Sequence, residues 1–126
     1  MQTDDFFRHA AKAISNLINK RPDLLRRFAI AYSQGNHYIH TNAEGTEKIM
    51  QKYLHGDEKA IREAYTDIVL KATPKIPYPS KPGIQTLLDF IAKTTPEAAN
   101  AKPDDFVDTR FVKELEDNGF YANLYR

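Results

Sequence analysis

The sequence predicts an all-α protein with no sheet of its own. Apolar residues recur at spacings of three and four in several stretches, which is the period of an α-helix. No stretch of five or more residues alternates between apolar and polar side chains, as a half-buried strand would. We therefore expect about six helices in antiparallel hairpins, packed around the longest helical pattern, which runs from Arg21 to Asn42.

The helix predicted between Arg21 and Asn42 carries one apolar stripe. Pro22 suits a first helical turn, and Asp23 complements the positive end of the helix dipole. Gly35 lies on the stripe and costs about 1 kcal/mol relative to alanine, so we expect another backbone to pass close to it. The residues of the stripe, all expected to face the core, are Leu24, Phe28, Ala31, Tyr32, Gly35, Tyr38 and Ile39.

Another helix is predicted before this one, from Asp4 to Lys20, with Thr3 or Asp4 as its cap. Ser15-Asn16 offers the alternative of a break followed by a short second helix. The residue before Pro22 is biased away from helical angles, which favours an end near Lys20. Its inward residues are expected to be Phe6, Ala10, Ile14, Leu17 and Ile18.

Two more helices follow the longest one. Asn42 can cap a helix over 43–54, which Gly56 ends in a left-handed conformation, and Asp57 can cap a helix from Glu58 to about Ala72. The inward residues are expected to be Thr46, Ile49, Met50 and Tyr53 in the first, and Ala60, Ile61, Ala64, Tyr65, Ile68 and Val69 in the second.

Four prolines between residues 73 and 82 rule out a helix there, so this stretch is predicted to be a connector that brings two helical hairpins together. A ligand for a polyproline-reading domain is the alternative, but no clean basic motif flanks the prolines. Ser80 can cap a helix from about Lys81 to Lys93. Its inward residues are expected to be Ile84, Leu87, Leu88 and Ile91.

The remaining sequence predicts one more helix and a tail. Residues 94–105 are polar and contain two prolines, which indicates a loop with one short helical turn at most. Asp108 can cap a helix from Thr109 to Asn118 that Gly119 ends, with inward Phe111, Val112 and Leu115. Residues 120–126 form an aromatic tail that needs a partner surface.

Length and composition indicate a single helical domain over residues 1–126. The net charge of +1, with both signs interspersed, gives no reason to expect a nucleic-acid partner. No run approaches 18 apolar residues, so no membrane insertion is expected. The first residues lack the features of a signal peptide, which leaves a cytoplasmic location open.

No residue pattern predicts a catalytic, cofactor or metal site. His37 and His40 are three residues apart and precede Glu44 and Glu47, but the helix boundary between them makes convergence on one metal ion unexpected. The adjacent pairs Asp4-Asp5 and Asp104-Asp105 do not face each other, and the sequence contains no cysteine and no phosphate-binding loop. Four tyrosines on apolar stripes are expected to pack in the core or in a groove rather than to stack on a ligand: Tyr32, Tyr38, Tyr53 and Tyr65.

Four phrases in a fixed order resemble a known family. They are Arg21-Pro-Asp-Leu-Leu-Arg-Arg-Phe28, Tyr38-Ile-His-Thr-Asn42, the segment from Ala60 to Tyr65, and Phe106-Val-Asp-Thr-Arg-Phe-Val-Lys-Glu-Leu115. This series, from about Ser15 to Phe120, resembles the C-terminal portion of substrate-binding proteins of ABC importers for nitrate, sulfonate, taurine and thiamine-pyrimidine precursors.

The resemblance implies transport, a periplasmic or cell-surface location, and the importer's permease or the rest of the binding protein as partners. Members are two-lobed α/β proteins about twice this length or more, and the ligand is held mainly by the half that has no counterpart here. We therefore carry over no ligand-binding residue, and expect a fragment or reduced relative that does not hold ligand alone. Its apolar surface would be exposed unless another copy or partner covers it.

Two other hypotheses stay open. The chain can be a stand-alone helical interaction module that forms a homodimer through its apolar faces and the aromatic tail. An enzyme of thiamine-pyrimidine synthesis is the third hypothesis. It is not favoured, because the histidine- and cysteine-rich set of residues that such chemistry uses is not visible in the sequence.

Overall fold

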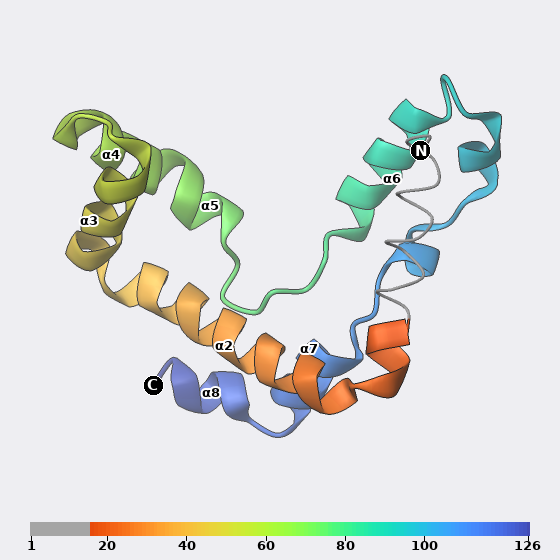
Figure 1. Ribbon diagram of the computed structural model, residues 1–126, viewed down its shortest axis with the longest axis horizontal. Coiled ribbons are helices and arrows are strands. Elements are labelled where there is room, and N and C mark those ends of the chain that lie inside the picture. The colour runs from red at the N-terminus through yellow and green to blue at the C-terminus, as the bar shows by residue number, and fades with distance from the viewer. Residues whose placement is uncertain (1–15) are drawn as a thin grey trace.

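A computed structural model describes residues 16–126, and within this range it contains helices and no strand, which confirms the all-α prediction. Residues 16–20 are helical, as predicted; the expected inward residues Phe6, Ala10 and Ile14 and the cap at Thr3 or Asp4 lie outside the described residues. Figure 1 shows α2 (Pro22–Thr41) as the base of the molecule, with one arm rising at each end.

The first arm is a helical hairpin. Helix α3 (Ala43–Leu54) turns back into α4 (Glu58–Ala64), which continues through a π-helical turn (Tyr65–Val69) into α5 (Leu70–Ala72). Both predicted caps are confirmed, because the side chains of Asn42 and Asp57 accept hydrogen bonds from the third backbone N–H beyond them, at 2.9 and 3.0 Å.

The left-handed residue that ends α3 is His55, with φ of 54°, and not Gly56 as predicted. Gly56 instead lies against the side chain of Ile61, where a Cβ atom would come within 3.2 Å of it. Histidine is one of the few residues with a side chain that is enriched in this conformation.

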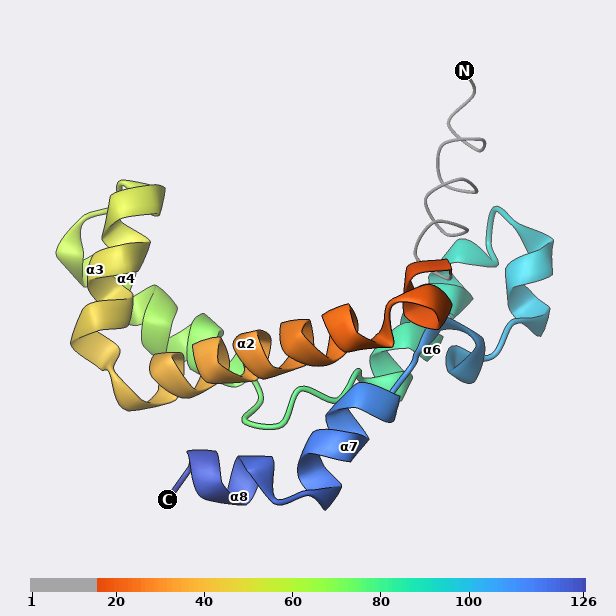
Figure 2. The same cartoon turned by 60° about the horizontal axis from the view of Figure 1, so that its bottom comes forward.

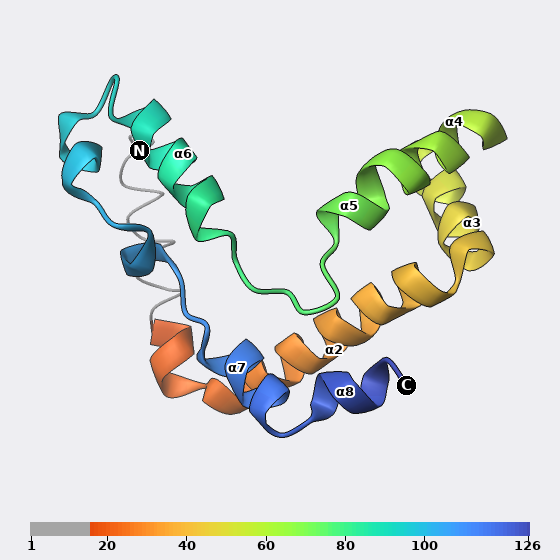
Figure 3. The same cartoon turned by 180° about the vertical axis from the view of Figure 1, so that it is seen from behind.

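The second arm begins after the proline-rich connector, residues 73–80. Helix α6 (Lys81–Ile91) has the predicted cap, since the Ser80 hydroxyl accepts a hydrogen bond from Gly83 N–H at 3.2 Å. Two 3-10 turns follow, Pro96–Asn100 and Pro103–Phe106, where one was predicted. Figures 1 and 3 show the two arms well apart, so the connector links them without bringing them together.

Helices α7 (Arg110–Asp117) and α8 (Phe120–Leu124) lie beside α2 (Figure 2). Helix α7 begins one residue later than predicted, and the carboxylate of Asp108 accepts a hydrogen bond from the backbone N–H of Arg110 at 3.1 Å. Gly119 ends α7 with φ of 79°, as predicted. The expected tail is the short helix α8, whose partner surface is α2 of the same chain.

The core is small. The described residues include only five buried apolar side chains, those of Ile61, Tyr65, Leu88, Leu115 and Tyr121. Leu88 and Leu115 occupy the inward positions predicted for α6 and α7. Many other residues predicted to be inward are exposed: Leu17, Leu24, Phe28, Tyr32, Tyr38, Ile49, Tyr53, Ile68, Leu87 and Ile91.

Helix α2 is turned the opposite way from the prediction. Its buried residues are Ser33 and Asn36, which are 0% and 3% exposed. The apolar stripe faces solvent, and Phe28 and Tyr32 on it are 66% and 51% exposed. The predicted backbone contact at Gly35 is also absent, because no atom of the described residues lies within 4 Å of the place where its Cβ would be.

Candidate functional site

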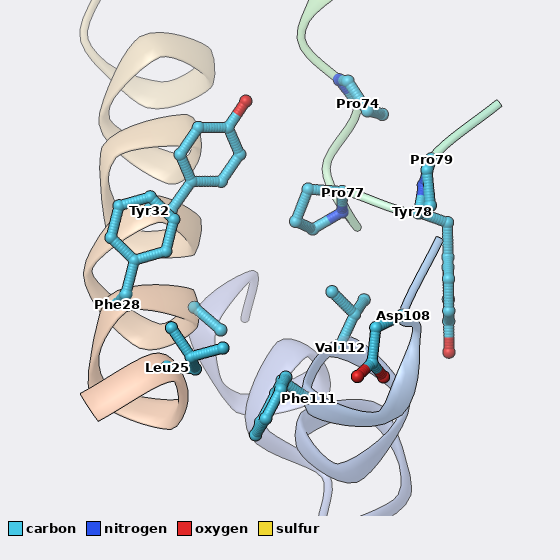
Figure 4. A pocket seen from close by; sticks show the side chains of 11 residues that line it. Leu25, Phe28, Tyr32, Pro74, Pro77, Tyr78, Pro79, Asp108, Phe111 and Val112 are labelled. Atoms are coloured by element: carbon cyan, nitrogen blue, oxygen red, sulfur yellow. The ribbon is translucent and has the colours of Figure 1, made fainter. Parts of the chain in front are cut away.

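An apolar groove runs between α2, the connector and α7 (Figure 4). It encloses a cavity of about 430 Å³. The lining residues come from three segments that are far apart in the sequence. They are Leu25, Phe28, Ala29 and Tyr32 of α2, Pro74, Pro77, Tyr78 and Pro79 of the connector, and Asp108, Phe111 and Val112 at the start of α7.

The α2 wall of the groove is aromatic. Phe28 and Tyr32 are one helical turn apart, and their rings stack with centroids 6.1 Å apart and planes 26° apart. Figure 4 shows Phe111 of α7 near Leu25, and Val112 farther along the groove beside Asp108. A guest in the groove would therefore meet ring faces and methyl groups.

The opposite wall is the connector, which is fixed by hydrogen bonds to its carbonyl groups. Prolines hold its φ angles but donate no N–H groups, so no regular ladder can form there. Asn36 donates to the carbonyl of Pro74 at 3.0 Å, and His40 Nε2 lies 2.6 Å from the carbonyl of Thr73. Tyr125 of the C-terminal stretch donates to the carbonyl of Lys75 at 3.2 Å.

Two polar groups at the rim, those of Asp108 and Tyr78, already have partners. Arg110 donates from Nε and Nη2 to the carboxylate of Asp108, at 2.9 and 2.6 Å, and these hydrogen bonds lower the pKa of Asp108. Tyr78 donates to Glu116 at 2.6 Å, and this hydrogen bond raises the pKa of Tyr78 to about 12. The groove therefore suits an apolar group.

The histidines and glutamates considered as metal ligands do not converge. His40 bonds to the connector rather than to carbonyls of its own helix, and the ring of His37 meets that of Tyr125 edge-on at 5.1 Å. Glu44 pairs with Lys48 and Glu47 with Arg62. Within residues 16–126 no three His, Asp or Glu side chains gather closely enough to hold a metal ion.

The four tyrosines expected in the core or in a groove separate into two groups. Tyr65 is 6% exposed and donates to the carbonyl of Ile39 at 2.7 Å, as a core tyrosine should. Tyr32, Tyr38 and Tyr53 are exposed, which corrects the prediction for Tyr38 and Tyr53. Of these three, Tyr32 lines the groove.

Sequence reasoning missed the groove itself. Its one sequence signal was the cluster of prolines, which fixes the shape of one wall. Phe28 and Tyr32 of the α2 wall belong to the predicted apolar stripe, but the sequence did not show that they would face the connector and α7 across an open groove.

Searches among protein families, characterised proteins and solved structures find no match to this chain. The resemblance to substrate-binding proteins therefore stays a prediction from the sequence. No helix within residues 16–126 is long and apolar enough to cross a membrane.

Proposed function

We propose that this chain is the helical C-terminal segment of a solute-binding protein of an ABC importer for small anions or thiamine precursors. The ordered series of sequence phrases supports this proposal, and so does one structural observation. Six of the seven residues on the apolar stripe of α2, the longest helix, are exposed, and Ile39 is half-buried. In the proposal, the rest of the binding protein covers this stripe.

The exposed apolar area of the stripe is large enough for its burial by another polypeptide to be favourable. Leu24, Phe28, Tyr32 and Tyr38 are between 38% and 66% exposed. Together they leave roughly 400 Å² of mainly apolar side chain in water, worth on the order of 10 kcal/mol on full burial before the costs of association. Exposed patches of this kind mark interaction surfaces.

The groove also supports the proposal that the isolated chain does not bind the ligand. Nitrate and sulfonate groups need N–H donors or cations. The groove offers ring faces, prolines and one carboxylate that is already paired with Arg110. Ligand capture then depends on residues outside this chain.

The size of the native protein tests the proposal. An antibody raised against residues 110–126 should detect, in the periplasmic or cell-surface fraction of the source cells, a protein at least twice as large as the 14.4 kDa of this chain. A band at 14.4 kDa alone would refute the receptor role.

Thermal stability with candidate ligands gives a second test, because a ligand that binds only the native state raises the melting temperature. Nitrate, taurine and a thiamine-precursor pyrimidine should leave the melting temperature of this chain unchanged. One of them should raise that of the longer protein. A shift in the isolated chain would contradict the proposal that it does not hold ligand alone.

A stand-alone module that forms a homodimer is the second candidate. The stripe favours it, because the large residues Phe28 and Tyr32 and the small residues Ala31 and Gly35 lie on the same exposed face. The aromatic tail plays no part in this version, because Tyr121 is 4% exposed and bonds to Ser33 of its own chain.

A further inference from the structure

We propose that two copies of this chain pair through the exposed faces of α2, antiparallel, with Phe28 of each copy seated over Gly35 of the other. The proposal deepens the second candidate function and does not depend on the receptor proposal. It concerns the 126-residue chain when no other polypeptide covers α2.

The first step is that the stripe forms one narrow, open face. At 100° per residue, every residue of the stripe points within about 60° of the direction of Gly35. Ser33 points about 160° away from Gly35 and Asn36 about 100° away, and they bond to Tyr121 and Pro74. Other segments of the chain meet the stripe at Phe28 and Tyr32, which line the groove, and at Tyr38, which lies beside Gly45 of α3. They leave Leu24, Ala31 and Gly35 exposed.

The second step is that the stripe matches its own reversed copy. When two such helices lie antiparallel around a two-fold axis between Ala31 and Tyr32, these two residues face each other across the interface. Phe28 then faces Gly35, and Leu24 faces Ile39. Phe28 thus meets Gly35 and Tyr32 meets Ala31, and this pairing of a large residue with a small one is what close packing between two helices requires.

The third step is that the projecting side chain, Phe28, and the space that receives it, beside Gly35, are both present in the single chain. Phe28 is 66% exposed, so its ring is available to a second copy. Apart from its chain neighbours and the backbone of its own helix, no atom of the described residues lies within 4 Å of the Cβ position of Gly35. A partner's ring would fill this space, which explains why a residue unfavourable in a helix interior stands there.

The small interface area indicates that the dimer should be weak. The four large side chains give roughly 400 Å² per copy, and the smaller residues bring the total for both copies to about 1,000 Å², the lower limit for a specific interface. We therefore expect a reversible dimer with a dissociation constant in the micromolar range.

Sedimentation equilibrium over a range from sub-micromolar to high micromolar concentration tests the pairing. The mass should rise from 14.4 kDa toward twice that value. Gly35→Phe should raise the dissociation constant by about tenfold or more, because it fills the space that receives Phe28. Gln34→Phe, which adds the same side chain beside the stripe, should leave it within about twofold, since surface changes away from specific contacts have small effects.

A rescue experiment separates the predicted contact from general disruption. Phe28→Ala combined with Gly35→Phe moves the large residue to the other side of each contact, so the double variant should dimerise more tightly than Gly35→Phe alone. Far-UV circular dichroism should show that each variant keeps the helical content of the wild type. A wild-type chain that stays monomeric, or a Gly35→Phe variant that dimerises like it, overturns the proposal.

Cross-linking gives a readout that does not depend on those variants folding normally. The chain contains no cysteine, so a single Ala31→Cys beside the proposed axis should be joined to its copy by a short bismaleimide. Lys52→Cys, exposed on α3, should not. Equal cross-linking at both positions would refute the antiparallel pairing, whereas the receptor proposal would still be decided by the size of the native protein.

Discussion

The two faces of α2 differ in a way that reverses the usual rule for an amphipathic helix. The buried face carries Ser33, Asn36 and His40, and each bonds to another segment: Tyr121 of α8, and the carbonyls of Pro74 and Thr73. The exposed face carries the apolar stripe. The contacts of α2 inside this chain are thus organised by polar groups rather than by its apolar residues.

The proline-rich connector explains this arrangement. A stretch without helix or strand leaves carbonyl groups that need donors from elsewhere, and prolines supply none. Asn36, His40 and Tyr125 are those donors. The comparison teaches that a side chain can be buried because a neighbouring backbone needs a donor, while the apolar face remains free for another polypeptide.

The largest difference between the faces should appear when one aromatic residue is removed from each. Tyr121→Ala takes away a ring that is 4% exposed and packs on the polar face, and should lower the free energy of unfolding by about 3–4 kcal/mol. Phe28→Ala on the apolar face should lower that of the monomer by less than about 1 kcal/mol. Urea denaturation at sub-micromolar concentration measures both, and equal losses would contradict the comparison.

A smaller effect is expected from the polar face alone. Asn36→Ala removes the donor to the Pro74 carbonyl and leaves that carbonyl without its partner. The free energy of unfolding should fall by about 1–2 kcal/mol. Gln34→Ala, on an exposed side of the same helix, is the matched control and should change it by less than about 0.5 kcal/mol. No difference between the two variants would show that the connector does not depend on Asn36.

Two glycines sharpen the comparison further. Gly35→Ala should raise the free energy of unfolding of the monomer by about 0.5–1 kcal/mol, because the new methyl group meets nothing and the helix gains propensity. Gly45→Ala should lower it, since the methyl group would overlap the Tyr38 hydroxyl and the capping side chain of Asn42. Thermal unfolding of both variants decides this, and the same sign in both would contradict the packing described here.

The smallest effect concerns Tyr78, and it is seen only at high pH. Its pKa is raised from 10.0 to about 12 by the hydrogen bond to Glu116, so the folded state holds the phenolic proton more tightly than the unfolded state. The resulting stabilisation is fully present below pH 10 and is lost as the pH rises to about 12. Tyrosinate absorbance should show one residue titrating near the upper value, and Tyr78→Phe should remove it.

The sequence predicted local features well and long-range ones poorly. Caps at Asn42, Asp57 and Ser80 depend on a side chain and a backbone group three residues away, so they can be read directly. Helix α8 was interpreted as a tail, because five residues are too few to show a helical period. The sequence predicted the wrong face of α2 to be buried, because a prediction from periodicity assumes that a chain covers its own apolar stripe.

The groove could not be predicted for a related reason. Polar residues of α2 hold the connector wall in place, and hydrogen bonds between such donors and carbonyl groups leave no periodic signal in the sequence. A more informative approach would have been to look for Asn, His and Tyr residues that could donate hydrogen bonds to the carbonyl groups of the proline-rich stretch.

The contacts that attach α7 and α8 to α2 join residues far apart along the chain. Arg26 meets Glu114, and Ser33 meets Tyr121, each across 88 positions. While the polypeptide emerges from the ribosome, α2 must wait until all the intervening residues have been added before it gains these neighbours. During that interval α2 has the connector as a neighbour, through Asn36 and His40, but lacks the helices that later cover Arg26 and Ser33.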